Sequence, residues 1–565
     1  MSRLLTLGLR WQGRPLMQRL EAATKAPAAA QQVLLQQLLS HHATTQFGQA
    51  HQFAAIRTPA DYRRAAPIRD YEDFRPYVQQ MMVGKAQILV NDPVRMFTLT
   101  SGTTGKPKYI PVTAKVERGG ARLMRQWLYR ILQAHPKFLS RAVVGIVSPA
   151  IEGYTSGGIP YGSLSGRIYQ QIPAWIRQTY AIPYGVFEIA DYDARYWTIA
   201  RFALAREISF LCTPNPSTLH RLATVMSDHS ESLIRAIYEG GMGNGRQESE
   251  MGALALALPR RLQANRQRAR QLERIRDATG GLRPKDCWPH LQLLGCWTGG
   301  SVGVQAQQLA ADYGPLPIRD LGYLASEARV TLPYQDNAAG GLLNLTQNFY
   351  EFIPEDCVDQ ADPPVLLSHE LEPGQRYQIL LTTPGGLYRY DINDIVEVTG
   401  YYHQSPVVAF VRKGRDMSNL TGEKLHVNHV LSAIATLQRQ FHLIVGPYRL
   451  APNLEMMRYE LYLELPPDQF ASLKDSWITQ QLLPSFDQAL AQVNSEYAQK
   501  RASRRLNSPC LHRMRSGWAE TVQRRAIAQG QRDVQYKWPI LCQTPLPEDA
   551  EAILQTYVVD AQSHV

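Results

Sequence analysis

The segment TSGTTGKPK, from Thr100 to Lys108, follows the apolar run RMFTLT (95–100) and precedes a helix predicted to begin near Ala114. The apolar run is predicted to be a strand. Small and hydroxyl residues at the end of a strand allow backbone N–H groups and hydroxyls to converge on phosphate oxygens. The segment therefore predicts a phosphate-binding loop whose contact residues are Ser101, Gly102, Thr103, Thr104 and Gly105.

This loop is not a Walker loop. Only two residues separate Gly102 from Gly105-Lys106, and Pro107 stands where that motif carries the Ser or Thr that binds magnesium. A turn rich in glycine and threonine is also common in loops that bind nothing. The segment alone therefore leaves a phosphate site and an ordinary loop as alternatives.

After the loop, short apolar runs alternate with amphipathic helical segments. The runs lie at 142–149, 208–214 and 291–297, and the helical segments at 115–134, 216–238, 260–278 and 301–312. This alternation predicts an α/β domain with largely buried strands flanked by helices. Upstream, residues 59–78 mix prolines, aromatic residues and charges without a period, which predicts a loop-rich lead-in.

Between residues 341 and 412 the strands become closely spaced, and Pro384-Gly385-Gly386 marks a tight bend. This pattern predicts an antiparallel β subdomain. A polar loop follows, then a helix from about Val427, strands at 441–449 and 456–465, and helices at 467–476 and 485–499. We therefore expect a large N-terminal α/β domain, residues 1–411, and a small α+β C-terminal domain, residues 412–565.

Charge and composition limit the function classes. The chain of 565 residues has a net charge of +11, but its basic residues are spread among 49 acidic ones. Such a field favours anionic substrates such as ATP over nucleic acid. The six cysteines lie far apart with no CxxC pair, which suggests neither a zinc site nor a disulfide framework. No apolar run reaches the ~20 residues of a membrane span, so we expect a soluble, cytoplasmic protein without a membrane anchor, whose oligomeric state stays open.

Later motifs narrow the class of the loop. The segment LGYLASE (321–327) contains Tyr-x-x-Ser-Glu, YRYDIND (388–394) ends in an aspartate, and QYKWP lies at 535–539. With the loop, these motifs resemble those of the acyl-adenylate-forming superfamily, and in particular those of the Gretchen Hagen family of plant acyl acid amido synthetases. The resemblance extends from about residue 95 to residue 540.

The resemblance implies a role for each matching residue. Tyr323 would border the adenine, and Ser326 of the same motif would belong to the nucleotide site. Glu327 would help to hold magnesium, and Asp394 would accept hydrogen bonds from the two ribose hydroxyls. Carboxylates suit both tasks, because an ionised carboxylate only accepts hydrogen bonds and Mg²⁺ takes oxygen ligands. Phe349, in the aromatic segment NFYEFIP (348–354), is a candidate to stack near the nucleotide, although a core strand explains it equally well.

The chain departs from the family pattern just before Asp394. The family usually has glycine at this place, whereas this chain has Asn393. Asparagine also tolerates a left-handed backbone.

A cation is needed for adenylation, because two anions must meet and negative charge develops on the phosphoryl oxygens. Lys537 is the first choice, Lys424 in LTGEKL (420–425) is the alternative, and Lys108 ends the phosphate loop. The superfamily's small domain swings about a hinge, which matches residues 412–416 here. Gly414 would absorb the backbone change, and Arg415 is expected near the nucleotide.

The resemblance thus implies an enzyme that uses ATP and Mg²⁺ to convert a carboxylic acid into its acyl-adenylate and then transfers the acyl group to an amine such as an amino acid. An acyl-CoA ligase and a nucleotide-binding protein without turnover remain as alternatives. The QYKWP motif favours the amine as acceptor, and the retained charged residues favour catalysis. The identity of the acid is open, and five aromatic residues are candidates for its pocket: Trp127, Tyr154, Tyr161, Tyr169 and Trp297.

Overall fold

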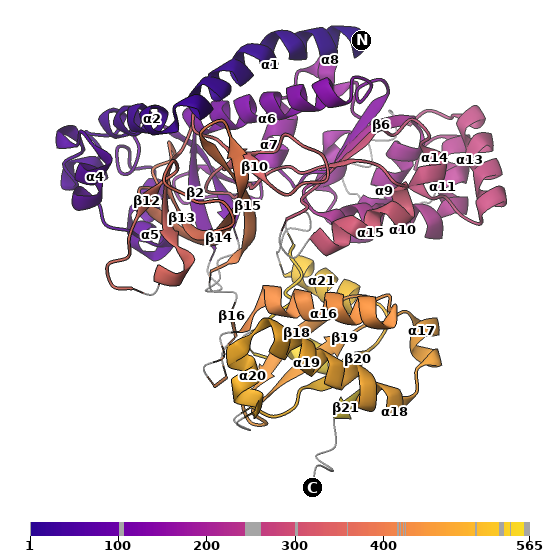
Figure 1. Cartoon of the computed structure of the whole chain (residues 1–565). Coiled ribbons are helices and arrows are strands. Elements are labelled where there is room, and N and C mark those ends of the chain that lie inside the picture. The colour runs from indigo at the N-terminus through magenta and orange to yellow at the C-terminus, as the bar shows by residue number, and fades with distance from the viewer. Residues whose placement is uncertain are drawn as a thin grey trace. The chain divides into compact units, whose positions relative to one another are not determined.

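The computed structural model describes residues 2–100, 107–242, 262–299, 303–358, 360–414, 417–418, 420–421, 423, 425–502, 506–529, 536–542 and 544–558. The chain forms two compact units, Met1–Val411 and Arg412–Val565 (Figure 1). Within the described ranges, no helix is both long and apolar enough to cross a membrane.

The largest sheet of the N-terminal unit has seven strands in the order β12-β11-β13-β14-β15-β10-β9. Every pairing that the structure describes in this sheet is antiparallel. The prediction of an antiparallel β subdomain in this part of the chain is therefore confirmed. The strands are β9 (Thr331–Leu332), β10 (Gly341–Leu343), β11 (Phe349–Pro354), β12 (Leu366–Leu367), β13 (Arg376–Thr382), β14 (Tyr390–Tyr402) and β15 (Ser405–Lys413).

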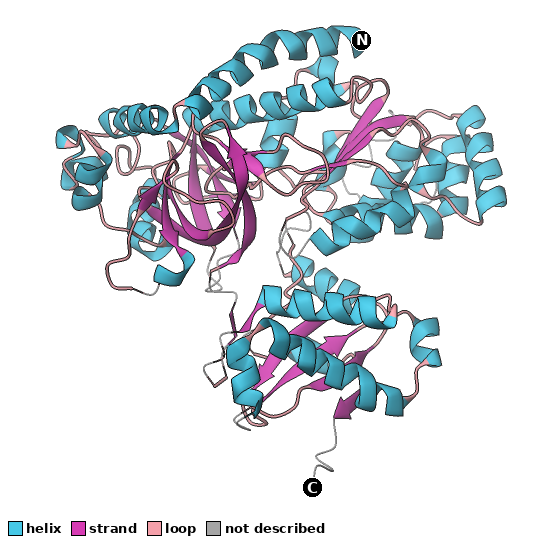
Figure 2. Cartoon of the chain, viewed as in Figure 1, coloured by secondary structure: helices cyan, strands magenta, loops and turns pink. Residues whose placement is uncertain are grey.

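Two smaller sheets complete the N-terminal unit. The sheet β2-β1-β5-β4 is mixed, whereas the sheet β3-β6-β7-β8 is parallel. Figure 2 shows helices gathered around the parallel sheet, as expected for strands that are buried on both faces. The strands are β1 (Val94–Thr100), β2 (Lys108–Thr113), β3 (Ala142–Gly145), β4 (Gly153–Tyr154), β5 (Pro160–Gly162), β6 (Ile208–Cys212), β7 (Leu293–Gly295) and β8 (Ile318–Arg319).

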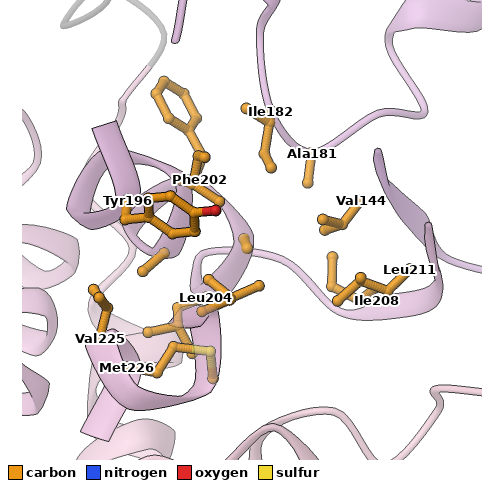
Figure 3. Packing of buried hydrophobic residues seen from close by; sticks show 14 of the residues in the cluster. Val144, Ala181, Ile182, Tyr196, Phe202, Leu204, Ile208, Leu211, Val225 and Met226 are labelled. Carbon is orange, nitrogen blue, oxygen red and sulfur yellow. The ribbon is translucent and has the colours of Figure 1, made fainter. Parts of the chain in front are cut away.

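The core beside the parallel sheet joins strands to helices. Val144 of β3 and Leu211 of β6 belong to the same buried cluster as Tyr196 and Leu204 of α9 and Met226 of α10 (Figure 3). The α/β architecture predicted from the sequence is confirmed. The described helices of this unit are α1 (Ser2–Lys25), α2 (Pro27–His41), α3 (Gln46–Ala50), α4 (Pro59–Ala65), α5 (Tyr71–Met82), α6 (Ala114–Ala134), α7 (Leu164–Gln171), α8 (Ala174–Arg177), α9 (Tyr192–Leu204), α10 (Pro216–Asp228), α11 (Ser230–Glu239), α13 (Arg266–Thr279), α14 (Pro284–Cys287) and α15 (Gly303–Tyr313).

The lead-in at residues 59–78 is helical, so the prediction of a loop-rich segment was wrong. Helices α4 and α5 each begin with a capping box, formed by Thr58 with Asp61 and by Asp70 with Asp73. In each box the first side chain accepts from the backbone N–H three residues on, and the second side chain returns the bond. These caps start two short helices whose prolines and charges hide the helical period.

The C-terminal unit is a four-stranded sheet in the order β18-β19-β20-β21, in which β19 and β20 are parallel. Helices α16 and α19 share one buried apolar cluster with the sheet, and α21 shares a second, smaller cluster. Strand β18 begins at Tyr448, later than the start at residue 441 predicted from the sequence. Residue 441 is instead the last residue of helix α16. The main elements are α16 (Val427–Phe441), β18 (Tyr448–Asn453), β19 (Arg458–Leu463), α17 (Pro467–Ser472), α18 (Asp475–Trp477), α19 (Leu483–Val493), α20 (Ser495–Ala502), β20 (Cys510–Met514), α21 (Trp518–Ala528), α22 (Pro547–Ala550) and β21 (Ile553–Val558).

The cap of α5 makes a testable contribution to local stability. Asp70 accepts hydrogen bonds from the backbone N–H groups of Glu72 at 2.8 Å and Asp73 at 3.3 Å. We expect Asp70→Ala to lower the opening free energy of α5 by about 1 kcal/mol, which hydrogen exchange of residues 71–82 measures. Asp70→Ser keeps a capping oxygen and should retain most of the protection, and equal losses in both variants would contradict this role.

Candidate active site

The predicted phosphate loop connects two antiparallel strands. Thr100 of β1 pairs with Lys108 of β2, and helix α6 begins at Ala114, directly after β2. In the order of the chain, strand β2 therefore comes between the loop and the helix. The loop residues Ser101, Gly102, Thr103, Thr104 and Gly105 lie outside the described part of the chain.

The motif that contains Tyr323 and Glu327 forms a tight reversal of the chain. Gly322 has φ +88° and lies so close to the backbone of Thr331 that a Cβ would stand 2.5 Å from the carbonyl oxygen of Thr331. Backbone hydrogen bonds from Val330 to Tyr323 and from Ala325 to Ala328, both 2.9 Å, close the turn. Glycine is thus required at the entrance, and the turn presents Ser326 and Glu327 at its tip.

Two of the predicted site residues meet at Tyr390, and two more are paired with each other. The hydroxyl of Tyr390 donates to Glu327 Oε1 at 3.3 Å, and Lys108 Nζ lies 3.5 Å from the same hydroxyl. The hydroxyl of Tyr323 donates a very short hydrogen bond to Asp394 Oδ2. Thr98 of β1 donates to the carbonyl of Ser326 at 3.5 Å, so the strand that leads into the loop lies beside this turn.

Tyr390 is a site residue that the sequence reasoning did not select. Burial, with the nearby carboxylates of Glu327 and Asp394, raises the pKa of Tyr390 well above its ordinary value. Burial and Asp394 raise the pKa of Tyr323 in the same way. Both phenols are therefore neutral hydrogen-bond donors at physiological pH. The only signal for Tyr390 was its place in the YRYDIND motif, four residues before Asp394.

A buried ion network fixes the start of β14, which carries Tyr390 and Asp394. Glu351 of β11, which is 1% exposed, accepts from Arg389 Nε at 2.9 Å and from Arg63 Nε of α4 at 3.0 Å. Arg69 and Tyr390 form a parallel bridge, in which Asp391 N–H donates to the carbonyl of Arg69 at 2.8 Å. The motif is therefore held from both sides by protein groups.

Asn393, which stands where the family usually has glycine, has φ +57°. Its N–H donates to Asp391 Oδ1 at 2.7 Å. The residue thus adopts the left-handed backbone that the sequence led us to expect, and Asp394 follows it with only 2% exposure.

The aromatic candidates are placed in different environments. Phe349 is 1% exposed in the core cluster and packs edge-on against Tyr62, a placement that favours the core-strand alternative.

The candidates for the acid pocket differ in burial. Trp127 is buried and donates to the carbonyl of Asp320 at 2.8 Å, and Tyr169 is also buried. Tyr161 packs against Tyr109, whereas Tyr154 is 63% exposed. Trp297 lies at the edge of a core cluster.

The segment with Lys537 belongs to the C-terminal unit. The Lys537 side chain is exposed, but backbone hydrogen bonds from Leu450 to Ile540 and from Cys542 to Leu450 attach its segment to β18. Arg449 donates to the carbonyl of Pro539 at 3.1 Å, and its guanidinium lies 4.3 Å from the Trp538 ring centre.

Arg449 itself is fully buried, and its Nη1 lies 2.6 and 2.7 Å from the two carboxylate oxygens of Asp549. The backbone that directly follows Lys537 is thus fixed to the sheet. The other two predicted residues near the hinge, Arg415 and Lys424, lie outside the residues that the structure describes.

A cavity of about 810 Å³ lies elsewhere in the N-terminal unit. Its walls include Glu355, Asp356, Glu370, Glu372 and Glu397. None of the predicted site residues lines it, and its acidic walls would repel an anionic substrate such as ATP.

The architecture is similar to that of two solved structures of the GH3.15 acyl acid amido synthetase. A GH3.15 acyl acid amido synthetase in complex with 2,4-DB superposes with a TM-score of 0.83 and 18% identity, covering 97% of each chain. A second GH3.15 structure gives 0.81 and 17%, covering 96% of this chain and 97% of the other. At such low identity the likeness establishes the fold, namely a large α/β unit followed by a separate C-terminal domain.

Residues 16–318 match the GH3 family N-terminal domain, 341–413 the central domain and 428–545 the C-terminal domain, so the chain belongs to the GH3 family. Indole-3-acetic acid-amido synthetase GH3.3 of Arabidopsis thaliana is 21% identical, over 96% of this chain and 95% of that protein. Jasmonoyl–L-amino acid synthetase JAR6 of Nicotiana attenuata is 23% identical, over 72% and 73%. The resemblance inferred from the motifs is confirmed.

The buried carboxylate of Glu351 should be essential to the N-terminal unit. We expect Glu351→Gln to lower its free energy of unfolding by about 3 kcal/mol, because Arg389 and Arg63 would lose their shared counter-charge. Urea denaturation measures this loss. Glu397→Gln is the control: its pair with Arg376 is partly exposed (33% and 43%), so its loss should cost less than about 1 kcal/mol. Similar losses in both variants would contradict the role of Glu351.

Proposed function

We propose that the chain is an ATP-dependent acyl acid amido synthetase, which activates a carboxylic acid as its acyl-adenylate and transfers the acyl group to an amino acid. The observation that carries the proposal is the cluster of Lys108, Glu327 and Asp394 around the hydroxyls of Tyr390 and Tyr323. Membership of the GH3 family supports it, since the relatives named above are amido synthetases.

The proposed first half-reaction is an attack of the acid's carboxylate oxygen on the α-phosphorus of ATP. A new P–O bond forms, the bond from the α-phosphorus to the bridging oxygen of the β-phosphate breaks, and pyrophosphate leaves. Two anions approach each other, so cations must offset the charge. We assign this role to Lys108 and to Lys537, with Lys424 as the alternative to Lys537.

Asp394 is suited to the ribose because a buried carboxylate accepts hydrogen bonds from hydroxyl donors. Tyr323 already donates such a bond to Asp394 Oδ2 and thereby orients the carboxylate. The two ribose hydroxyls of the nucleotide can donate hydrogen bonds to a carboxylate in the same way as the phenol does. Charge-assisted bonds of this type are stronger than bonds between neutral groups.

Glu327 is suited to magnesium. Its carboxylate is half-buried and receives a hydrogen bond of 3.3 Å from Tyr390, which leaves acceptor capacity on its oxygens. Magnesium bound with ATP would neutralise phosphate charge and would take one oxygen ligand from Glu327. Tyr390, as a neutral donor, would keep that carboxylate oriented.

In the proposed second half-reaction the amine nitrogen attacks the carbonyl carbon of the acyl-adenylate. The C–N bond forms, the bond from carbon to the AMP oxygen breaks, and the amine loses a proton. An amine as the acceptor, rather than coenzyme A, is supported by the QYKWP motif and by the two amido synthetases to which the chain is similar.

The decisive experiment is pyrophosphate release by the purified chain with ATP, magnesium and a panel of carboxylic acids, each with amino acids, with coenzyme A or with neither. We expect release that depends on the acid and rises with amino acids, and an amide in the mass spectrum. A rise only with coenzyme A would replace the proposal by an acyl-CoA ligase. If the chain binds ATP but releases no pyrophosphate with any acid, the alternative of a nucleotide-binding protein without catalytic turnover would be favoured.

The role of Lys537 is tested by Lys537→Ala. We expect the rate of acid-dependent pyrophosphate release to fall by at least about 10²-fold, because one charge on the developing phosphoryl oxygens is no longer offset. ATP binding, measured by calorimetry, should stay nearly unchanged. Lys474→Ala removes another exposed lysine of the same unit and should leave the rate unaltered. A near-normal rate in Lys537→Ala would move the role to Lys424.

The role of Asp394 is tested by Asp394→Asn. We expect the KM for ATP to rise by about tenfold, which corresponds to the loss of one charge-assisted hydrogen bond. The KM for the acid should change little, because Asp394 is assigned to the ribose alone. Glu397→Gln, on the same strand, serves as the control. An equal rise of both KM values would indicate a general distortion of β14 instead.

A further inference from the structure

Three side chains with metal-ligating atoms meet inside the C-terminal unit. Cys510 and His512 lie two residues apart on β20, so they point to the same face of the sheet. Glu460 of β19 is the parallel register partner of Cys510. All three are buried, and one ligand atom from each lies within 4.8 Å of the others.

One of the two printed distances within this trio, that between His512 and Glu460, is long for a hydrogen bond. Cys510 Sγ lies 3.4 Å from His512 Nε2, and that nitrogen lies 3.4 Å from Glu460 Oε2. A charge-assisted N–H···O bond is normally about 2.7–2.9 Å. The contact between His512 and Glu460 therefore leaves more room than a direct hydrogen bond requires, whereas 3.4 Å is an ordinary distance for a hydrogen bond to sulfur.

The same distances fit the edges of a zinc tetrahedron. Bonds of about 2.3 Å for Zn–S and about 2.05 Å for Zn–N and Zn–O, at tetrahedral angles, place S and N about 3.6 Å apart and N and O about 3.3 Å apart. Thiolate, imidazole and carboxylate are all common zinc ligands. The spacing and the donor set thus point to the same metal.

Neighbouring groups hold each ligand in place. His512 Nδ1 lies 2.8 Å from Thr556 Oγ1, so a proton on Nδ1 leaves the lone pair of Nε2 facing the trio. Asn453 donates to Glu460 Oε1 at 2.8 Å, and Tyr462 donates to Glu460 Oε2 at 3.1 Å. Such partners fix the orientation of metal ligands.

Charge and access are also suitable. The guanidinium of Arg458 lies 3.5 Å from Glu460 Oε1 and offsets one negative charge, which leaves a net charge of about −1 for the set once the thiol is ionised. The side chains of His512 and Glu460 each keep 9% exposure, so the site is in contact with solvent. Three protein ligands leave a fourth position to water.

A second group, formed by His41, His42 and Asp92, is less suitable for a cation. His41 Nε2 and Asp92 Oδ2 already form a hydrogen bond of 2.8 Å.

We propose that Glu460, Cys510 and His512 bind a zinc ion that ties β19 to β20. The binding releases the thiol proton of Cys510. The site cross-links two strands that are separated in the sequence by α17 to α20. It does not depend on the proposed enzymatic function, and its chemistry is structural.

The test uses the full chain without a histidine tag, loaded with zinc and then dialysed. We expect about one zinc per chain by atomic emission. Cobalt(II) in place of zinc should give the near-ultraviolet thiolate-to-cobalt band and the visible bands of a tetrahedral ion. Cys510→Ser should lose the thiolate band and at least about tenfold in zinc affinity. Cys542→Ser, another buried cysteine of this unit, should keep both.

Two results would overturn the proposal. One is a wild-type chain that retains no zinc after dialysis and shows no cobalt band, a result that does not depend on whether any variant folds. The other is zinc that stays bound in Cys510→Ser, which would place the metal at another site. Loss of zinc and of the cobalt band in Cys510→Ser, with Cys542→Ser unchanged, would assign the ion to this trio.

Discussion

The carboxylate of Glu351 is the interaction on which the rest of the N-terminal unit depends. It joins β11, the start of β14 and helix α4 through Arg389 and Arg63, and it does so at 1% exposure. Burying these charges costs desolvation energy, which is offset only when the geometry of the ion pairs is good. Arg389 also has φ +47°, a backbone that needs support from its surroundings. The network therefore stabilises one conformation of the YRYDIND segment. Because Tyr390 and Asp394 belong to this segment, the network also determines where they lie.

Around that fixed strand, the site is organised by neutral phenols that donate to carboxylates. Tyr323 and Tyr390 have raised pKa values because they are buried beside Asp394 and Glu327. They consequently remain donors, and each orients a carboxylate without adding charge. A nucleotide hydroxyl or a magnesium ion can approach carboxylates that are already oriented, so less conformational freedom is lost on binding. This arrangement explains why acidic groups and tyrosines, and not basic residues alone, surround the proposed site of an anionic substrate.

Periodicity in the sequence was sufficient to predict the parallel α/β layer and the antiparallel sheet, because long strands and helices carry a regular apolar pattern. It failed at residues 59–78, where two short helices depend on the capping boxes of Thr58 and Asp70. The resemblance selected Lys108, Tyr323, Glu327 and Asp394, which do lie together. Tyr390 could not be recognised in this way, because its role depends on a tertiary contact with Glu327. The trio of Glu460, Cys510 and His512 has no sequence motif either, since it requires the register between β19 and β20.

The C-terminal unit holds the segment with the exposed Lys537 against its sheet. Its sheet has an apolar face under α16 and α19, and the other face buries polar groups such as Arg449 and Asp549. Arg449 contacts the carbonyl of Pro539 and the ring of Trp538, so the charge that anchors the segment lies next to Lys537. The side chain of Lys537 is exposed, whereas the backbone after it is held by hydrogen bonds to β18. If the small domain moves as one body, the lysine moves with it. The buried pair of Arg449 and Asp549 is then the part of the unit that defines the position of the segment with Lys537, because apolar packing alone would not specify the position of that backbone segment.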